Sequence, residues 1–238
     1  MIDIHSHVLF GIDDGATSME MSVEMLRSYV AQGVTHVFCT SHSRCAMEYY
    51  HKNFARLQQR ISQEQLPIRI YKGCEVECSE EEMPEIIKHL NSGFYPTMNG
   101  TKFVLVEFEP YDTADTILHC IRYIEQHSDY RPIIAHVERY KAIRKNPDLL
   151  LTLRGMGCLF QVNVYSLAQT KDEEIKTFAR HLASIGKIDF LGSDAHRTYH
   201  RPPAVESGLA YLKDACHSTY CNSISHEHAM QQLINLDN

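Results

Sequence analysis

The sequence predicts an α/β fold, and three observations support that class. Short β-rich runs alternate with stretches of helical apolar spacing along most of the chain. Strict alternation of strand and helix is typical of a parallel sheet, because each helix returns the chain to the start of the next strand. The alternation is not interrupted by a linker or an internal repeat, and 238 residues suit one barrel. We therefore expect a single domain, residues 1–238, that forms an α/β barrel. An open doubly wound sheet is the alternative.

Each expected element has a local pattern in support. Short runs rich in β-branched and aromatic residues predict strands over 2–8, 35–41, 68–77, 102–108, 132–137, 158–164 and 188–193. Apolar residues at helical spacing predict helices over 18–32, 52–65, 80–91, 113–128, 146–156 and 171–186, with two more over 203–215 and 225–236. Gly33 is expected to cap the first helix, and residues 172–174 place acidic side chains at the start of a later one.

Composition and charge exclude several classes of protein. The net charge of −7 and a pI near 6.1 lack the basic excess expected of a nucleic-acid-binding protein. No apolar run is long enough to span a membrane, and the opening MIDIHSHVLF does not read as a secretory signal. The eight cysteines form no CxxC pair, so we expect reduced thiols in a cytoplasmic protein.

Metal-ligating residue types follow almost every predicted strand. In an α/β barrel the chemistry lies at the carboxyl ends of the strands. The residues found there are His5, His7, His42, Glu75, Glu77, Glu107, Glu109, His136, Asp194 and His196. Residues two apart on a strand point to the same side, so His5 with His7, and Asp194 with His196, can each offer two ligands to one cavity.

Imidazole and carboxylate ligands without thiolates favour an open catalytic site for divalent ions over a closed structural zinc. The ligands are too many for one ion, so two or three ions are expected. Within each acid pair, Glu75 with Glu77 and Glu107 with Glu109, the residues alone do not decide which is the ligand. The IDDG loop at 12–15 either returns a carboxylate to the site or is a plain turn. The pair His226 and His228 lies in a predicted helix, where such residues diverge, and has no assigned role.

A set of motifs in order extends this reading. They are DIHSH and IDDG near the start, TSHSR at 40–44, GCEVE at 73–77, LVEFEP at 105–110, IIAHVERY at 133–140, QVNVYSL at 161–167, LGSDAH at 191–196 and HRPP at 200–203. Together they resemble the polymerase-and-histidinol-phosphatase (PHP) superfamily. Within it the chain is similar to the manganese-dependent protein-tyrosine phosphatases of bacterial capsule and exopolysaccharide gene clusters.

The resemblance implies a distorted (β/α)7 barrel and a trinuclear metal site. One metal would be held by His5, His7, Glu75 and Asp194. A second would share Glu75 with Glu107 and His136, and a third would be held by Asp14, His42 and His196. Arg139 and Arg201 would be the active-site arginines. Manganese is the metal implied first, with iron, zinc, magnesium or cobalt as alternatives. Two departures from the family pattern, Ser43 and Glu109, concern phosphate binding, and Arg44 is a candidate to compensate for Ser43.

The implied reaction is hydrolysis of phosphotyrosine by direct attack of water. The implied substrate is the tyrosine-rich tail of a partner bacterial tyrosine kinase, and the reaction would regulate polysaccharide synthesis. A cysteine nucleophile is disfavoured, because none of the eight cysteines has an arginine six positions later. A small-molecule phosphatase of the histidinol-phosphate type and a non-catalytic metal-binding regulator stay open. Tyr140 and Tyr165 would either stack on the substrate ring or pack in the barrel mouth.

Overall fold

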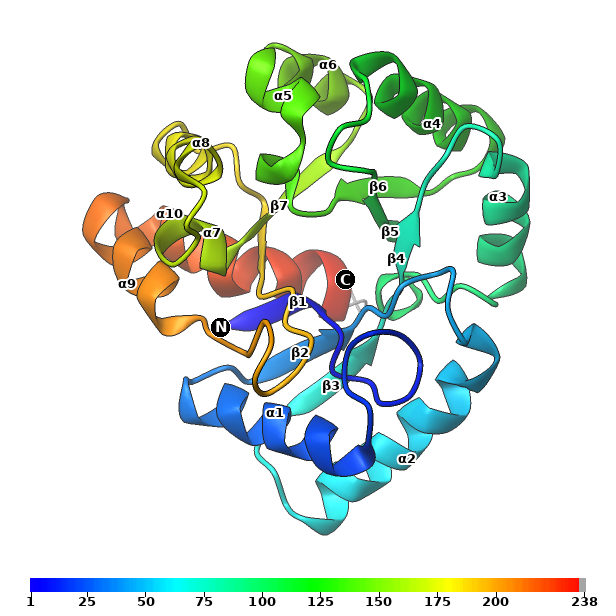
Figure 1. The fold of residues 1–238 in the computed structure, drawn as a ribbon, viewed down its shortest axis with the longest axis vertical. Helices are drawn as coiled ribbons and strands as arrows, with labels where there is room; N and C mark the ends of the chain where they lie inside the picture. The colour runs from blue at the N-terminus through cyan, green and yellow to red at the C-terminus, as the bar shows by residue number, and fades with distance from the viewer. Residues whose placement is uncertain (236–238) are drawn as a thin grey trace.

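The computed structural model, which describes residues 1–235, is a ring of parallel strands surrounded by helices (Figure 1). The strands are β1 (Ile2–Ser6), β2 (His36–Cys39), β3 (Arg69–Lys72), β4 (Glu75–Glu77), β5 (Phe103–Glu107), β6 (Arg131–Ile134), β7 (Leu159–Asn163) and β8 (Phe190–Gly192). They form two sheets, in the orders β1-β2-β3 and β4-β5-β6-β7-β8, and every pairing is parallel. Parallel pairing follows from the helical crossover that connects the strands of each pair within a sheet.

The two sheets join into a barrel at two places, one beside β8 and one beside β4. Beyond β8, the Asp194 N–H donates to the His5 carbonyl at 2.8 Å, and Ser6 forms a parallel bridge with Ala195. On the other side, the chain after β2 bridges to β4 through His42 and Glu75. The α/β-barrel prediction is therefore confirmed, and the open doubly wound sheet is wrong.

The strand predicted over 68–77 is an error, because the structure divides it into β3 and β4. β3 pairs with β2, whereas β4 pairs with β5. The break falls at Gly73, where a Cβ would lie 3.0 Å from both the Met98 sulfur and a Thr40 methyl carbon. A side chain here would have to displace both neighbours by a few tenths of an ångström, so glycine suits this close approach. The break makes the barrel irregular and turns Glu75 toward the end of β1.

The outer helices agree with the sequence prediction to within a few residues. They are α1 (Met19–Ala31), α2 (Tyr50–Gln63), α3 (Met83–Ser92), α4 (Ala114–His127), α6 (Leu149–Gly155), α8 (Glu173–Ser184) and α9 (Glu206–Ala215). Gly33 has a left-handed φ of 75° just after α1, and the Asp172 carboxylate caps α8 by accepting from two backbone N–H groups. The sequence did not predict α5 (Lys141–Lys145), α7 (Val164–Ala168), η1 (Met47–Tyr49), η2 (Met98–Gly100) or η3 (Val137–Arg139).

The C-terminal segment closes the end of the barrel at which the strands begin. It contains α10 (Ser218–Asn222) and two π-helical stretches, η4 (Ser223–Glu227) and η5 (Met230–Ile234). Ala229 and Leu233 are buried in one apolar cluster with Ile2, Phe103 and neighbouring strand residues. The helix predicted over 225–236 is thus π-helical, and its last residue lies outside the described residues. No helix within residues 1–235 is long and apolar enough to cross a membrane.

Candidate metal centre

The carboxyl ends of the strands bring all nine predicted metal ligands to one place. They are His5, His7, Asp14, His42, Glu75, Glu107, His136, Asp194 and His196. In the first group, His5, His7, Glu75 and Asp194 are all buried and offer ligand atoms within 4.8 Å of one another. The Glu75 carboxylate lies centrally, 3.0 Å from His5 Nε2 through one oxygen and 3.1 Å from His7 Nε2 through the other.

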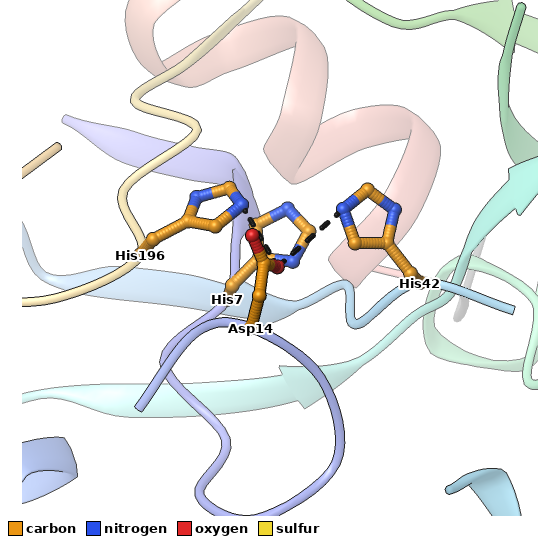
Figure 2. A group of neighbouring side chains, drawn as sticks. All are labelled: His7, Asp14, His42 and His196. Carbon is orange, nitrogen blue, oxygen red and sulfur yellow. Dashed lines mark ion pairs between the residues drawn. The ribbon is translucent and has the colours of Figure 1, made fainter. Parts of the chain in front are cut away.

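Two further groups share residues with the first. His7, Asp14, His42 and His196 form one of them, and Figure 2 shows their side chains converging from β1, the loop after it and the ends of two other strands. His42, Glu75 and Glu107 form the other, and His136 Nε2 lies 2.9 Å from Glu75 and 3.4 Å from Glu107. These groups have nearly the membership that the family resemblance implies. The alternative acids Glu77 and Glu109 belong to none of the three.

The donor atoms of this cluster fit divalent metal ions. His5 Nε2, His7 Nε2, His42 Nδ1 and Glu75 Oε2 are buried and lack a hydrogen-bond partner among the described residues. A buried polar atom without a partner is costly, so several such atoms facing one another indicate that an ion satisfies them. Imidazole nitrogen and carboxylate oxygen are the donors of catalytic divalent sites.

Two side chains that the sequence analysis missed orient the first histidines. His5 Nδ1 lies 3.0 Å from Gln161 Oε1, and His7 Nδ1 lies 2.8 Å from Asp13 Oδ2. An imidazole that donates from Nδ1 presents the Nε2 lone pair to a metal. Asp13 also accepts the N–H groups of Gly15 and His42, and Gln161 accepts that of His136. Both residues lie within motifs that the sequence analysis named, Asp13 in the IDDG loop and Gln161 at the start of QVNVYSL.

Unusual backbone conformations set the direction of several of these side chains. His136, Asp194 and Arg201 have positive φ angles of 31°, 56° and 51°. Such strain is tolerated where surrounding contacts hold it and is common at functional sites. Gly15 is required for a different reason, since a Cβ there would lie 2.2 Å from the His7 carbonyl oxygen. The loop therefore folds tightly against β1, which brings Asp13 and Asp14 to the histidines.

The pKa values of several side chains in this cluster are shifted by burial and by their charged neighbours. Burial alone would raise the pKa of Glu75, but the facing imidazole of His5 and its neighbours lower it well below the usual range. Burial alone would lower the pKa of His136, but hydrogen bonds with Glu107 and Glu75 outweigh it and raise that pKa to about 9. Burial and the charge of His7 lower the pKa of His196 to about 2, so this imidazole is neutral and ready to ligate.

Arg139 and Arg201 lie at the rim of the cluster. Both guanidinium groups pair with Asp194, and the Arg139 contact is 3.2 Å. Asn163 donates to the same Asp194 oxygen at 3.0 Å, which leaves the other oxygen directed toward His5 and His7. The two arginines line a cavity of about 400 Å³ whose floor contains His42, Glu75, Glu107 and His136. An anion in this cavity would therefore meet both the metal ligands and two planar cations.

The remaining predicted residues lie around the same cavity. Arg44 and Glu109 line it, and the Arg44 guanidinium also pairs with Glu82. Ser43 instead accepts the N–H of Glu77 at 3.0 Å. Cys39, whose spacing of five positions to Arg44 comes closest to the six of a cysteine phosphatase, is fully buried, and burial raises the pKa of its thiol. A buried neutral thiol is a poor nucleophile, which agrees with the absence of a cysteine-phosphatase motif.

The fold and the site define a class, the α/β-barrel proteins with clustered histidine and carboxylate side chains at the carboxyl ends of the strands. The family model for capsular polysaccharide synthesis proteins of the CpsB/CapC type matches residues 1–234. The tyrosine-protein phosphatase YwqE of Bacillus subtilis is 33% identical over 215 residues, which cover 86% of this chain and 82% of that protein. The tyrosine-protein phosphatase CpsB of Streptococcus agalactiae is 29% identical over 98% of this chain and 95% of its own length. The chain belongs to the CpsB/CapC family.

Solved structures agree with this membership. A structure from the study of YwqE of Bacillus subtilis and CpsB of Streptococcus pneumoniae, described as metal-dependent tyrosine phosphatases, superposes with a TM-score of 0.87 at 28% identity. The match covers 98% of this chain and 94% of that one. Histidinol phosphate phosphatase from Lactococcus lactis superposes with a TM-score of 0.61 at 17% identity and covers 91% of this chain, which shows a shared fold.

Proposed function

We propose that this chain is a metal-dependent protein-tyrosine phosphatase and that residues 1–238 form one phosphatase domain. The observation that carries the proposal is the juxtaposition of two features at one end of the barrel. Buried imidazole and carboxylate atoms without partners converge on common points, and two arginines lie beside them over one cavity. This pairing suits a phosphate ester, whose charge needs cations on several sides.

Each of the nine predicted ligand residues is assigned to the metals. Divalent ions bound there would supply Lewis-acid chemistry for hydrolysis of the ester by water. The protein's own contribution is orientation. Asp13 and Gln161 hold the rings of His7 and His5, and Asn163 holds the Asp194 carboxylate. Side chains held in this way need little reorganisation when substrate binds, which is how an active site lowers a barrier electrostatically.

Arg139 and Arg201 are assigned to the phosphoryl oxygens. A guanidinium donates through a planar fork that matches two oxygens of a phosphate, which the lysine ammonium cannot reproduce. Their side chains are 34% and 37% exposed, so an incoming substrate can reach them. The tyrosine leaving group has a pKa near 10 and needs less help from a proton donor than an alkyl alcohol does.

The names of similar proteins support a substrate and a cellular process for this chain. Proteins similar to this chain are tyrosine-protein phosphatases, and the family model describes capsular polysaccharide synthesis. We infer that this chain acts on the tyrosine-rich tail of a partner bacterial tyrosine kinase and so regulates polysaccharide synthesis. Manganese is the metal proposed. A cytoplasmic location is proposed from the eight cysteines, all of which are free thiols.

The test compares three substrates at equal concentration, namely a phosphotyrosine peptide, the matching phosphoserine peptide and histidinol phosphate. We expect phosphate release from the phosphotyrosine peptide to be fastest. The His136→Ala variant should lose turnover while keeping the circular-dichroism spectrum of the wild type. Preference for histidinol phosphate would reject the protein-substrate proposal, and a fully active His136→Ala variant would reject the assigned site.

A further inference from the structure

A second cavity lies on the other side of the two arginines. Its volume is about 470 Å³, within the usual size of a small-molecule site. It shares Arg139, Asp194 and Arg201 with the metal-facing cavity. A phosphoryl group that binds both arginines would therefore lie at the boundary between the two cavities. The rest of the substrate must then extend into one of them.

The walls of the two cavities differ in chemistry. Beyond the ligands, the metal-facing cavity is lined by Phe108 and Pro110 but also by the acidic side chains of Glu77, Glu109 and Asp112. The second cavity has no carboxylate except the shared Asp194, and its wall includes Tyr165 and Ile175. An apolar ring gains free energy where it covers apolar surface and gains none beside hydrated carboxylates. The second cavity, here called the aryl pocket, is thus the better place for an aromatic group.

Tyr165 offers the aromatic surface in the aryl pocket. It is 44% exposed, and among residues 1–235 it is the one exposed large apolar side chain that lines either of the two cavities. Tyr140, the other candidate for ring stacking in the sequence, is only 1% exposed and packs against Phe108. Packing in the barrel mouth therefore accounts for Tyr140 but leaves much of Tyr165 uncovered.

The element that carries Tyr165 is firmly held. The chain just before it is tied to the arginine-bearing turn, because the Asn163 N–H donates to the buried Glu138 carboxylate at 3.1 Å. On its other side α7 packs so closely on α9 that a Cβ at Gly208 would lie 2.2 Å from the Val164 carbonyl oxygen. Tyr165 is therefore fixed relative to Arg139, as a surface that selects substrates should be.

We propose that the aryl pocket binds the aromatic ring of the substrate phosphotyrosine while Arg139 and Arg201 hold its phosphoryl group, with Tyr165 as the specificity-determining residue. This inference rests on the proposed function and names where the leaving group lies. Ring-on-ring contact adds to the free energy of simple burial. The pocket would thus distinguish aryl from alkyl phosphates by affinity.

The test measures binding of phenylphosphonate and of methylphosphonate to the manganese-loaded chain by titration calorimetry. The ratio of the two dissociation constants isolates the contribution of the ring. We expect Tyr165→Ala to reduce this ratio by about tenfold and Tyr165→Phe to preserve it. Tyr111, which is 80% exposed, provides a matched control, and Tyr111→Ala should leave the ratio unchanged.

Two threonines test which side the ring occupies. Thr170 lines the aryl pocket and Thr116 lines the metal-facing cavity. Thr170→Asp should lower the aryl preference more than Thr116→Asp does, because the new carboxylate would face the ring. A larger loss of aryl preference in Thr116→Asp than in Thr170→Asp would overturn the inference, and so would an unchanged ratio in Tyr165→Ala. If the wild type still hydrolyses phosphotyrosine, the proposed function stands in either case. Failure of the wild type to hydrolyse phosphotyrosine would overturn both.

Discussion

Replacing Asp13 by asparagine removes a charge that orients His7, one of the proposed metal ligands. One carboxylate oxygen accepts from His7 Nδ1 at 2.8 Å and from the His42 N–H at 3.0 Å, and the other accepts the Gly15 N–H at 3.0 Å. An asparagine has a single acceptor oxygen, so at least one of these donors would face an amide NH₂ instead. Leaving a buried donor unpaired costs about 1–3 kcal/mol.

The expected effect of Asp13→Asn is a 10- to 100-fold loss of metal affinity, the usual range for partners of ligating histidines. That range corresponds to about 1.4–2.7 kcal/mol, which matches the cost of one unpaired donor. Titration calorimetry of Mn²⁺ into the chelator-stripped variant measures the change. Asp148→Asn is the matched control, since Asp148 is exposed at the start of α6 and makes no side-chain capping bond. An Asp13→Asn dissociation constant within twofold of the wild type would refute the orienting role.

Three other predictions concern protons, phosphate and the barrel floor. The pKa of His136 is raised to about 9, so this side chain carries a proton at neutral pH in the metal-free chain. Metal binding to His136 must release that proton, and the metal affinity should therefore rise with pH up to about 9. Calorimetry in buffers of different ionisation enthalpy measures the release, and its absence would contradict the charged state. Arg139→Lys should lower kcat/KM for a phosphotyrosine peptide about 10- to 100-fold with little change in metal content, because the planar fork is lost; wild-type kinetics would remove Arg139 from phosphate binding. Leu233→Ala should lower the free energy of unfolding in urea by about 2–5 kcal/mol, since Leu233 is fully buried at the closed end of the barrel; a change below 0.5 kcal/mol, typical of surface positions, would mean that this segment does not brace the fold.

The barrel could be predicted from the sequence because it depends on a repeated pattern. Each strand and each outer helix has a characteristic spacing of apolar residues, and parallel pairing follows from the alternation of strands with helices. The break at Gly73 left no such signal. It depends on Met98 and Thr40, which contact this position from elements distant in sequence. The π-helical form of the C-terminal segment was missed for a different reason, since this form is rare and apolar spacing over a few residues does not distinguish it from an α-helix.

The convergence of these histidine and carboxylate side chains could also be predicted, because strand ends in a barrel meet at one face. Their grouping was open from the residues alone, and Glu75 could not be separated from Glu77. In the structure, Glu75 is 1% exposed at the centre of the cluster, whereas Glu77 accepts the Arg44 N–H farther out. The orienting residues were harder to predict from the sequence. Nothing distinguishes Gln161 from another polar strand residue until its contact with His5 is known. Hydrogen bonds between segments distant in sequence require coordinates.

The measurement that tests the account most directly is phosphotyrosine hydrolysis as a function of bound metal. The chain is stripped with chelator and reloaded with increasing Mn²⁺, and phosphate release is measured beside metal content at each step. We predict no turnover in the stripped chain and recovery in step with occupancy of the cluster around Glu75. Full turnover by the stripped chain would contradict the metal-dependent mechanism.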